Sequence, residues 1–265
     1  MSRIRFSRKQ LTLPYALFLL FFVVFPLLLI VYYAFTDNNG KLTLNNFVSF
    51  FSDNTKLSVL LISALIGFGN TALCLLFGYP VAMILSNKQY NNSKVIVMLF
   101  AMPMWINFVL RIAATRDLLY WIGINGGEYP YLATMIGMVY NYLPFTILPL
   151  YTTMLKMDKS LIEASYDLGA NKRQTFVKTI IPMTMPGVIS AATMVFMPTM
   201  SSFVISDVMG ENKIQLIGNT IQLNFDQGQW HSGSLIALIM LIIIGVTMLL
   251  TKNVQGQEDI RGSLW

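Results

Sequence analysis

The sequence has 265 residues, of which 55% are hydrophobic and only 11% are charged, and its formal net charge is +6. A soluble globular domain carries about a quarter charged residues, so this composition and a mean hydropathy of +0.61 exclude an ordinary water-soluble protein. The single cysteine, Cys74, and the single histidine, His231, exclude an intrachain disulfide and argue against a metal centre, so we expect no metal.

Six apolar runs along the chain are long enough to cross a membrane. A helix needs about 20 residues to span a hydrocarbon core of about 30 Å, and the runs cover residues 14–35, 59–85, 95–114, 132–154, 186–208 and 234–250. The second run is the longest and implies tilt or an interfacial extension. The sequence therefore predicts an all-α membrane protein with six transmembrane helices and one membrane domain over residues 1–265.

The basic residues predict the orientation of these helices. Arg3, Arg5, Arg8 and Lys9 precede the first run, which we interpret as a retained anchor helix rather than a cleaved signal peptide. With the N-terminus in the cytoplasm, the outer loops hold only Lys41, Lys56, Arg116 and Lys213, and most other Lys and Arg residues lie inside. The positive-inside rule then predicts a multi-pass protein of the cell membrane with both termini cytoplasmic. The basic residues form no cluster on a polar domain, so we expect the lipid bilayer and no nucleic acid as a partner.

The longest inner segment, residues 155–185, predicts two short helices. Ser160 and Glu163 have the spacing of a capping box, so a helix is expected to begin there, and Gly169 is suited to end it. A second helix is expected from Lys172 to Ile180, with Pro182 ending it. Such a hairpin could lie on the lipid headgroups or dock a cytoplasmic partner, and the pattern alone favours neither.

This segment resembles the EAA loop of binding-protein-dependent ABC importer permeases. The residues that carry the resemblance are Glu163-Ala164-Ser165, Asp167-Leu168-Gly169-Ala170, Phe176, Ile180-Ile181-Pro182 and Pro186-Gly187. The family pattern has a second alanine where this chain has Ser165. The resemblance implies the type I (MetI-like) permease fold and a coupling helix that docks on an ATPase subunit through Glu163, Ala164, Asp167 and Gly169.

The same resemblance implies the partners of the chain. They are two ATPase subunits, a second homologous permease and an extracytoplasmic solute-binding protein. The chain has no G-x-x-x-x-G-K-[ST] run, so we expect no cofactor in this chain, ATP bound by the partner subunit, and no enzymatic activity here.

Further motifs resemble one subfamily, the permeases of spermidine and putrescine importers, in particular the B-type subunit of their heterodimeric pair. These motifs are Phe77-Gly78-Tyr79-Pro80 with Ala82, Met102-Pro103-Met104-Trp105 with Asn107 and Arg111, Leu143-Pro144-Phe145, and Ser206-Asp207-Val208-Met209-Gly210. The resemblance implies a translocation path for polyamines. Import of another small solute, such as an inorganic anion, is the alternative within the same superfamily.

The charges on the outer side agree with a cationic solute. Acids outnumber bases there, and a negative vestibule concentrates cations. The acids are Asp37, Asp53, Asp117, Glu128, Asp207, Glu211 and Asp226. The aromatic rings of Trp105, Tyr140 and Tyr142 could hold an alkylammonium group. Acidic outer loops and interfacial aromatic belts also arise in membrane proteins without such a function.

The expected substrate path comprises Trp105, Asn107, Arg111, Tyr142 and Asp207. Arg111 is an ionisable residue within a span and would also suit an anion path. Because Arg111 and Asp207 both fall in the outer third of their spans, we expect them to form an ion pair, either structural or within the path.

The last outer loop contains an apolar stripe. Ile214, Ile217, Ile221 and Phe225 recur at helical spacing within residues 211–230. This spacing predicts a short re-entrant or interfacial helix, or a plain amphipathic surface helix.

Two other classes of membrane protein fit the sequence less well. A secondary transporter would need coupling carboxylates near the middle of the membrane, and the predicted spans carry none there. An intramembrane enzyme needs a catalytic constellation within a span, and the single histidine lies in a loop.

Overall fold

The computed structural model describes residues 8–87 and 95–262, with side chains for 14–87, 95–249 and 251. The described chain is almost entirely helical, with one isolated β-bridge between Thr36 and Leu42. Arg3 and Arg5 lie outside the described residues. The chain divides into two compact units, one formed by residues 1–57 and 220–243 and the other by residues 58–219 and 244–265.

The first unit begins with the anchor helix. It consists of α1 (Arg8–Leu19), the π-helical segment η1 (Leu20–Val24) and α2 (Phe25–Ala34). The stretch Pro14–Ala34 is apolar and long enough to cross a membrane. Most of its side chains are exposed, and Ala34 at its end is buried. A helix of the required length therefore forms at the first predicted span.

A compact corner follows the anchor helix in the same unit. It contains α3 (Asn45–Ser52), the end of α12 (Ile217–Asp226) and the beginning of α13 (Trp230–Gly262). Asn46 donates to the carbonyl oxygens of Ala34 at 3.0 Å and Thr36 at 2.9 Å. The His231 ring nitrogen Nδ1 lies 3.0 Å from the carbonyl oxygen of Tyr33. These contacts satisfy backbone groups at the end of α2.

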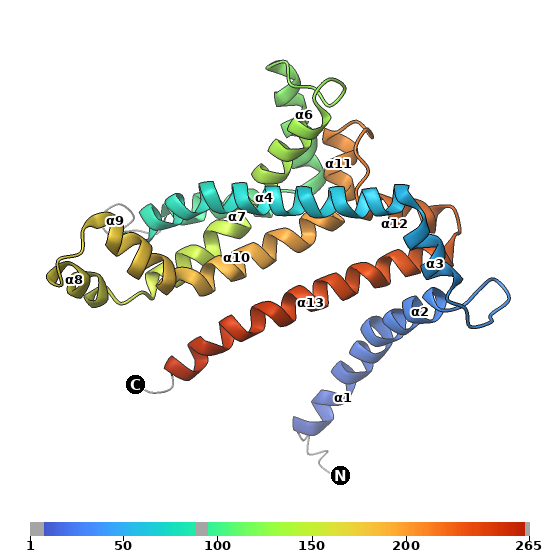
Figure 1. The fold of residues 1–265 in the computed structure, drawn as a ribbon, viewed down its shortest axis with the longest axis horizontal. Coiled ribbons are helices and arrows are strands. Elements are labelled where there is room, and N and C mark those ends of the chain that lie inside the picture. The colour runs from blue at the N-terminus through green and yellow to red at the C-terminus, as the bar shows by residue number, and fades with distance from the viewer. Residues whose placement is uncertain (1–7, 88–94, 263–265) are drawn as a thin grey trace, which may run out of the picture. The chain divides into compact units, whose positions relative to one another are not determined.

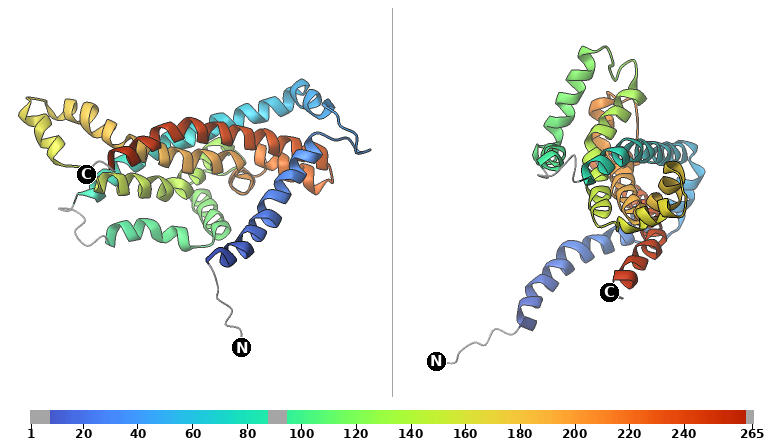
Figure 2. Two further views of the ribbon diagram at one scale, coloured as in Figure 1. Left: turned by 90° about the horizontal axis from the view of Figure 1, so that it is seen from below. Right: turned by 90° about the vertical axis from the view of Figure 1, so that its left-hand side faces the viewer.

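The second unit is built around three long helices, α4 (Asn54–Ser86), α7 (Pro130–Leu155) and α10 (Ile181–Ser201). Helices α7 and α10 lie side by side, as Figure 1 and Figure 2 show. Their close approach depends on Gly187, where a Cβ atom would lie only 2.6 Å from Thr153 Oγ1. Small residues at helix contacts are the common means of close packing in membranes.

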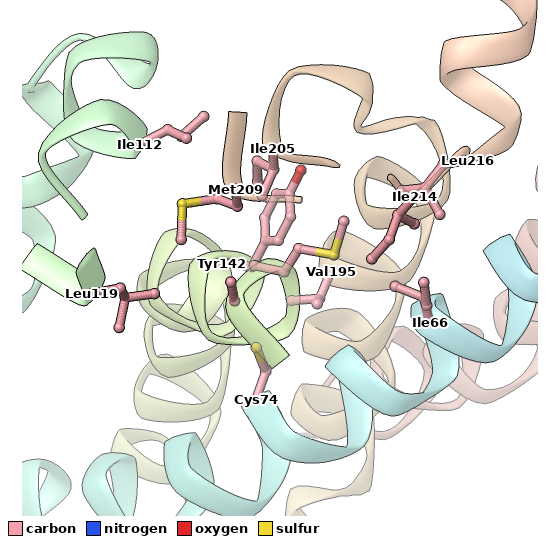
Figure 3. Close-up of a cluster of buried hydrophobic side chains, with 12 residues drawn as sticks. Ile66, Cys74, Ile112, Leu119, Tyr142, Val195, Ile205, Met209, Ile214 and Leu216 are labelled. Atoms are coloured by element: carbon pink, nitrogen blue, oxygen red, sulfur yellow. The ribbon is translucent and has the colours of Figure 1, made fainter. Parts of the chain in front are cut away.

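A buried apolar cluster connects several helices of this unit. Tyr142 of α7 lies between side chains of α4, α6 (Phe108–Trp121), α10 and α11 (Phe203–Met209), as Figure 3 shows. Its labelled members include Ile66, Cys74, Ile112, Leu119, Val195, Ile205, Met209, Ile214 and Leu216. The cluster fixes α6 and α11 against the long helices.

The third predicted span, 95–114, is sharply bent in the structure. Helix α5 (Val95–Ala101) continues as the 3-10 segment η2 (Met102–Trp105), and α6 leaves it at an angle of 98°. Ile106 is extended, and Asn107 caps α6 by accepting from the N–H groups of Val109 at 3.0 Å and Leu110 at 3.3 Å. A hydropathy average does not detect the break, because most of the residues at the break are apolar.

The fifth predicted span, 186–208, is displaced. The helix expected to end at Pro182 continues from α9 (Lys172–Thr175) through the π-helical segment η3 (Phe176–Ile180) into α10, and the spanning stretch is Lys172–Ser201. Pro182 lies at the start of α10, directly after the π-helical segment η3. The chain breaks at Ser202, where a Cβ atom on Gly218 would lie 2.2 Å from the carbonyl oxygen of Ser201.

Helices also form at the remaining predicted spans. Asn54–Ser86, Pro130–Leu155 and Trp230–Leu249 are long and apolar enough to cross a membrane, so the described residues contain five such helices, or six when the bent pair α5–α6 is one span. Helix α4 has 33 residues and is therefore about 50 Å long, which agrees with the expected extension of the second span. The helix predicted in the last outer loop is α12, and Ile214 lies before it.

Candidate functional site

The hairpin of residues 155–185 lies beyond the ends of α7 and α10, away from α6 and α11 (Figure 1, Figure 2). Its first helix, α8 (Ser160–Asp167), ends where the sequence predicts. Gly169 has a φ of +82°, its N–H donates to the carbonyl of Tyr166 at 2.8 Å, and the N–H of Ala170 donates to that of Ser165 at 3.1 Å. This pair of bonds is the Schellman motif, which needs a left-handed residue at the position of Gly169.

The beginning of α8 differs from the prediction. Ser160 is the first helical residue rather than the cap, and Asp158 Oδ1 accepts from the Ser160 N–H at 2.9 Å. This backbone hydrogen bond lowers the pKa of the Asp158 carboxyl. The capping box lies instead at α9, where Asn171 and Gln174 exchange side-chain and backbone hydrogen bonds of 2.9 Å. The sequence pattern of Ser or Thr followed by Glu does not include this box, because Asn and Gln take those two positions here.

Side chains hold the hairpin together and attach it to the long helices. Ser165 Oγ lies 2.9 Å from Thr175 Oγ1, which links α8 to α9. The ring of Phe176 meets Tyr79 of α4 edge-on at 5.9 Å, and the Tyr79 hydroxyl lies 2.8 Å from Thr184 Oγ1. The hairpin is therefore connected to both α4 and α10 within the same unit.

A Ser165→Ala change tests the link between α8 and α9. Because it removes one partly buried side-chain hydrogen bond, we expect a loss of about 1 kcal/mol in local stability and little change in transport, since alanine fits the same space. Hydrogen exchange of the α8 amides measures the first effect. Protection equal to that of the unchanged protein would contradict the assigned link.

The predicted docking residues lie on the open surface of the hairpin. Glu163, Ala164 and Asp167 are all exposed. Leu168 beside them is 89% exposed. The exposed surface therefore contains two carboxylates beside a short apolar region, and the turn at Gly169 follows directly after it.

The predicted path residues have different surroundings. Trp105 is 90% exposed at the end of η2, whereas Asn107 uses its side-chain oxygen to cap α6. Tyr142 is buried, and its hydroxyl donates to the carbonyl oxygen of Pro198 at 3.3 Å. The structure gives Asn107 and Tyr142 clear packing roles.

The expected ion pair between Arg111 and Asp207 is wrong. Arg111 Nε donates to Asn141 Oδ1 at 2.7 Å, and its Nη1 donates to the carbonyl oxygen of Pro103. Asp207 instead accepts from the side-chain amide of Asn219, which also bonds Ser206 Oγ at 2.9 Å. For both Arg111 and Asp207, a side-chain amide is the nearer polar group and takes the place of the expected partner of opposite charge.

The structure therefore adds residues that the sequence analysis missed. Asn141 and Asn219 orient the two charged side chains, and Asn70 Nδ2 donates to Thr199 Oγ1 at 2.7 Å between α4 and α10. Asparagine within an apolar run is costly unless it is hydrogen-bonded. Asn70 and Asn141 lie inside predicted spans, which is a signal in the sequence that does not name the partner, whereas Asn219 lies in a loop and gives no such signal.

Comparison with known proteins gives a consistent assignment. The family described as "Binding-protein-dependent transport system inner membrane component" matches residues 2–256. The spermidine/putrescine transport system permease protein PotB of Escherichia coli (strain K12) is 34% identical over 252 residues, which cover 87% of this chain and 91% of PotB.

Solved structures agree on the fold. The structure of a bacterial ABC transporter involved in the import of the acidic polysaccharide alginate is similar, with a TM-score of 0.66, 14% identity and 94% of each chain covered. The inward-facing MetNI methionine ABC transporter has a TM-score of 0.55 and 17% identity over 77% of this chain and 98% of that one. The fold is that of ABC importer permeases. The chain belongs to the family of binding-protein-dependent transport system inner membrane components, multi-pass proteins of the cell membrane.

Proposed function

We propose that this chain is the permease subunit of an ATP-driven importer that moves polyamines, spermidine or putrescine, across the cell membrane. The observation that carries the proposal is its 34% identity to a spermidine/putrescine permease over 91% of that protein. The excess of acidic residues on the expected outer side agrees with a cationic solute.

The partners of the chain follow from the same proposal. A solute-binding protein delivers the polyamine outside, a second permease completes the path, and two ATPase subunits hydrolyse ATP inside. Glu163, Ala164, Asp167 and Gly169 form the contact with an ATPase subunit. The exposure of the three side chains and the conformation of Gly169 support this role.

This assignment requires the hairpin and both termini to lie in the cytoplasm. A topology reporter fused after Gln257 should therefore report a cytoplasmic location, and one inserted at Gly127 an external location. The positive-inside distribution of Lys and Arg is the reason for this expectation. The opposite result at either position would reject the orientation.

Asp207 is the residue through which the proposed path would attract a cation. It is only partly buried, and its neighbour Asn219 is neutral, so the carboxylate has no cationic partner among the described side chains. Asp207→Asn keeps the shape and removes the charge, and we expect polyamine uptake to fall by about tenfold.

The matched control for this change is Asp117→Asn. Asp117 is exposed and already paired with Arg116 at 2.8 Å, so its loss should leave uptake unchanged. Radiolabelled spermidine uptake measures both variants at equal amounts of assembled complex. Equal uptake by Asp207→Asn and the unchanged protein would remove Asp207 from the path.

The function itself is tested by uptake in the cells that produce the protein. Deleting the gene should abolish high-affinity uptake of radiolabelled spermidine or putrescine, and returning the gene should restore it. A deletion strain with intact polyamine uptake and lost uptake of an inorganic anion would favour the alternative solute.

A further inference from the structure

Arg111 is a buried cation in the membrane part of the second unit, and no described carboxylate neutralises it. The residue is 7% exposed. Its two hydrogen-bond acceptors, Asn141 and the carbonyl of Pro103, are neutral. The ion pairs among the described side chains join Lys56 to Asp53 and Arg116 to Asp117. Because intramembrane charges are usually paired, the position of Arg111 points to an anion from outside the chain.

The surface around Arg111 is shaped for a helix. Arg111 lines an open groove of about 560 Å³ between α6 and α7. The walls include Leu110, Ala114 and Leu118 of α6, which follow one another at four-residue spacing, and Ile136 of α7. Leu110 and Leu118 are 67% and 65% exposed. A row at this spacing is the ridge that packs beside another helix.

The depth of Arg111 decides between possible anions. Its partner Asn141 lies 11 residues after Pro130 and 14 residues before Leu155 in α7, which places it about 16 Å and 21 Å from the two ends. Arg111 therefore lies near the middle of the length of α7, deeper than the outer third that its position in residues 95–114 predicts. Lipid phosphates lie at the surfaces of a core about 30 Å thick, and a polyamine is repelled by a guanidinium group. A carboxylate carried by a neighbouring membrane helix reaches this depth.

We propose that the α6–α7 groove receives a membrane helix of the second permease subunit, and that an Asp or Glu on that helix pairs with Arg111. The proposal rests on the proposed function in so far as a second permease is present. Complementary shape and charge both support it, because the ridge offers apolar contact and Arg111 offers a bidentate fork that suits a carboxylate. The experiments that test this proposal measure subunit assembly, so their outcome does not depend on which solute is transported.

Photo-crosslinking in the assembled transporter tests the surface. Leu118 is replaced by p-benzoylphenylalanine, and Leu76 of α4, 64% exposed and distant along the chain, receives the same residue as a control. We expect Leu118 to give a crosslink to a membrane-helix peptide of the second permease that contains Asp or Glu, and Leu76 to give none to that peptide. A Leu118 adduct confined to lipid, or to another copy of this chain, overturns the proposal.

A charge exchange tests the pair. Arg111→Glu should reduce copurification of the second permease by more than tenfold, whereas changing the crosslinked carboxylate of that subunit to lysine should restore it. Restoration cannot occur if Arg111→Glu only misfolds the chain. Wild-type copurification of Arg111→Glu, or absence of restoration in the double change, overturns the proposal. If the crosslink and the exchange succeed while polyamine uptake fails, the substrate assignment alone is wrong.

Discussion

Replacing Gly169 by leucine is expected to separate ATP hydrolysis from transport while leaving the protein in the membrane. Gly169 has a φ of +82°, and a Cβ atom there would meet nothing within 4 Å. The cost of the change is therefore conformational rather than steric. A leucine in the left-handed region costs about 1–2 kcal/mol, which is enough to unravel the end of α8 and to move the exposed surface formed by Glu163, Asp167 and Leu168.

The matched control is Gly169→Asn, because asparagine adopts the left-handed conformation more readily than leucine. ATPase activity stimulated by the loaded binding protein is measured for the complete transporter. The leucine variant should lose most of the stimulation, and the asparagine variant should keep most of it. Full stimulation in the leucine variant would reject the docking role, and equal loss in both would reject the conformational reason.

Replacing Gly187 by leucine is expected to prevent correct packing of the membrane unit. A Cβ atom at this position would lie 2.6 Å from Thr153 Oγ1 and 2.8 Å from Thr153 Cβ, and the carbonyl oxygen of Pro149 is 3.3 Å away. Overpacking a tight contact costs about 1–3 kcal/mol. The cost should be at the upper end here, because a longer side chain has to separate α7 from α10.

Gly245→Leu provides the control, since a Cβ atom at Gly245 meets nothing within 4 Å. The thermal unfolding temperature and the yield of monodisperse protein in detergent are measured for both variants. Gly187→Leu should lower both strongly, and Gly245→Leu should leave them near the values of the unchanged protein. Similar stability of the two variants would contradict the assigned α7–α10 contact.

These two glycines also show how far the sequence could predict the structure. The stop at Gly169 is a local feature, because one conformation at one residue ends a helix, and the sequence predicts it correctly. Gly187 belongs to the same family pattern, yet its reason lies in Thr153 on another helix. A contact of this kind has no signal in the local pattern.

The other differences between the predicted and the observed structure also depend on features that the local sequence pattern does not specify. Hydropathy predicts a span over residues 95–114 but not its sharp bend, because the direction of α6 depends on the cap that Asn107 forms and on the extended residue Ile106. The pairing of Arg111 with Asp207 assumes that opposite charges at similar depth meet. In the structure, Asn141 and Asn219 are nearer, and amide partners follow from helix packing, which the spacing of charges does not specify.

We propose that this chain moves polyamines by using ATP hydrolysed on another subunit. The complete transporter is reconstituted in proteoliposomes with ATP on the hairpin side and radiolabelled spermidine with the binding protein on the other. We predict accumulation of spermidine that requires ATP, the binding protein and an intact Gly169. Accumulation without ATP, driven by an ion gradient through the permease alone, would contradict the account.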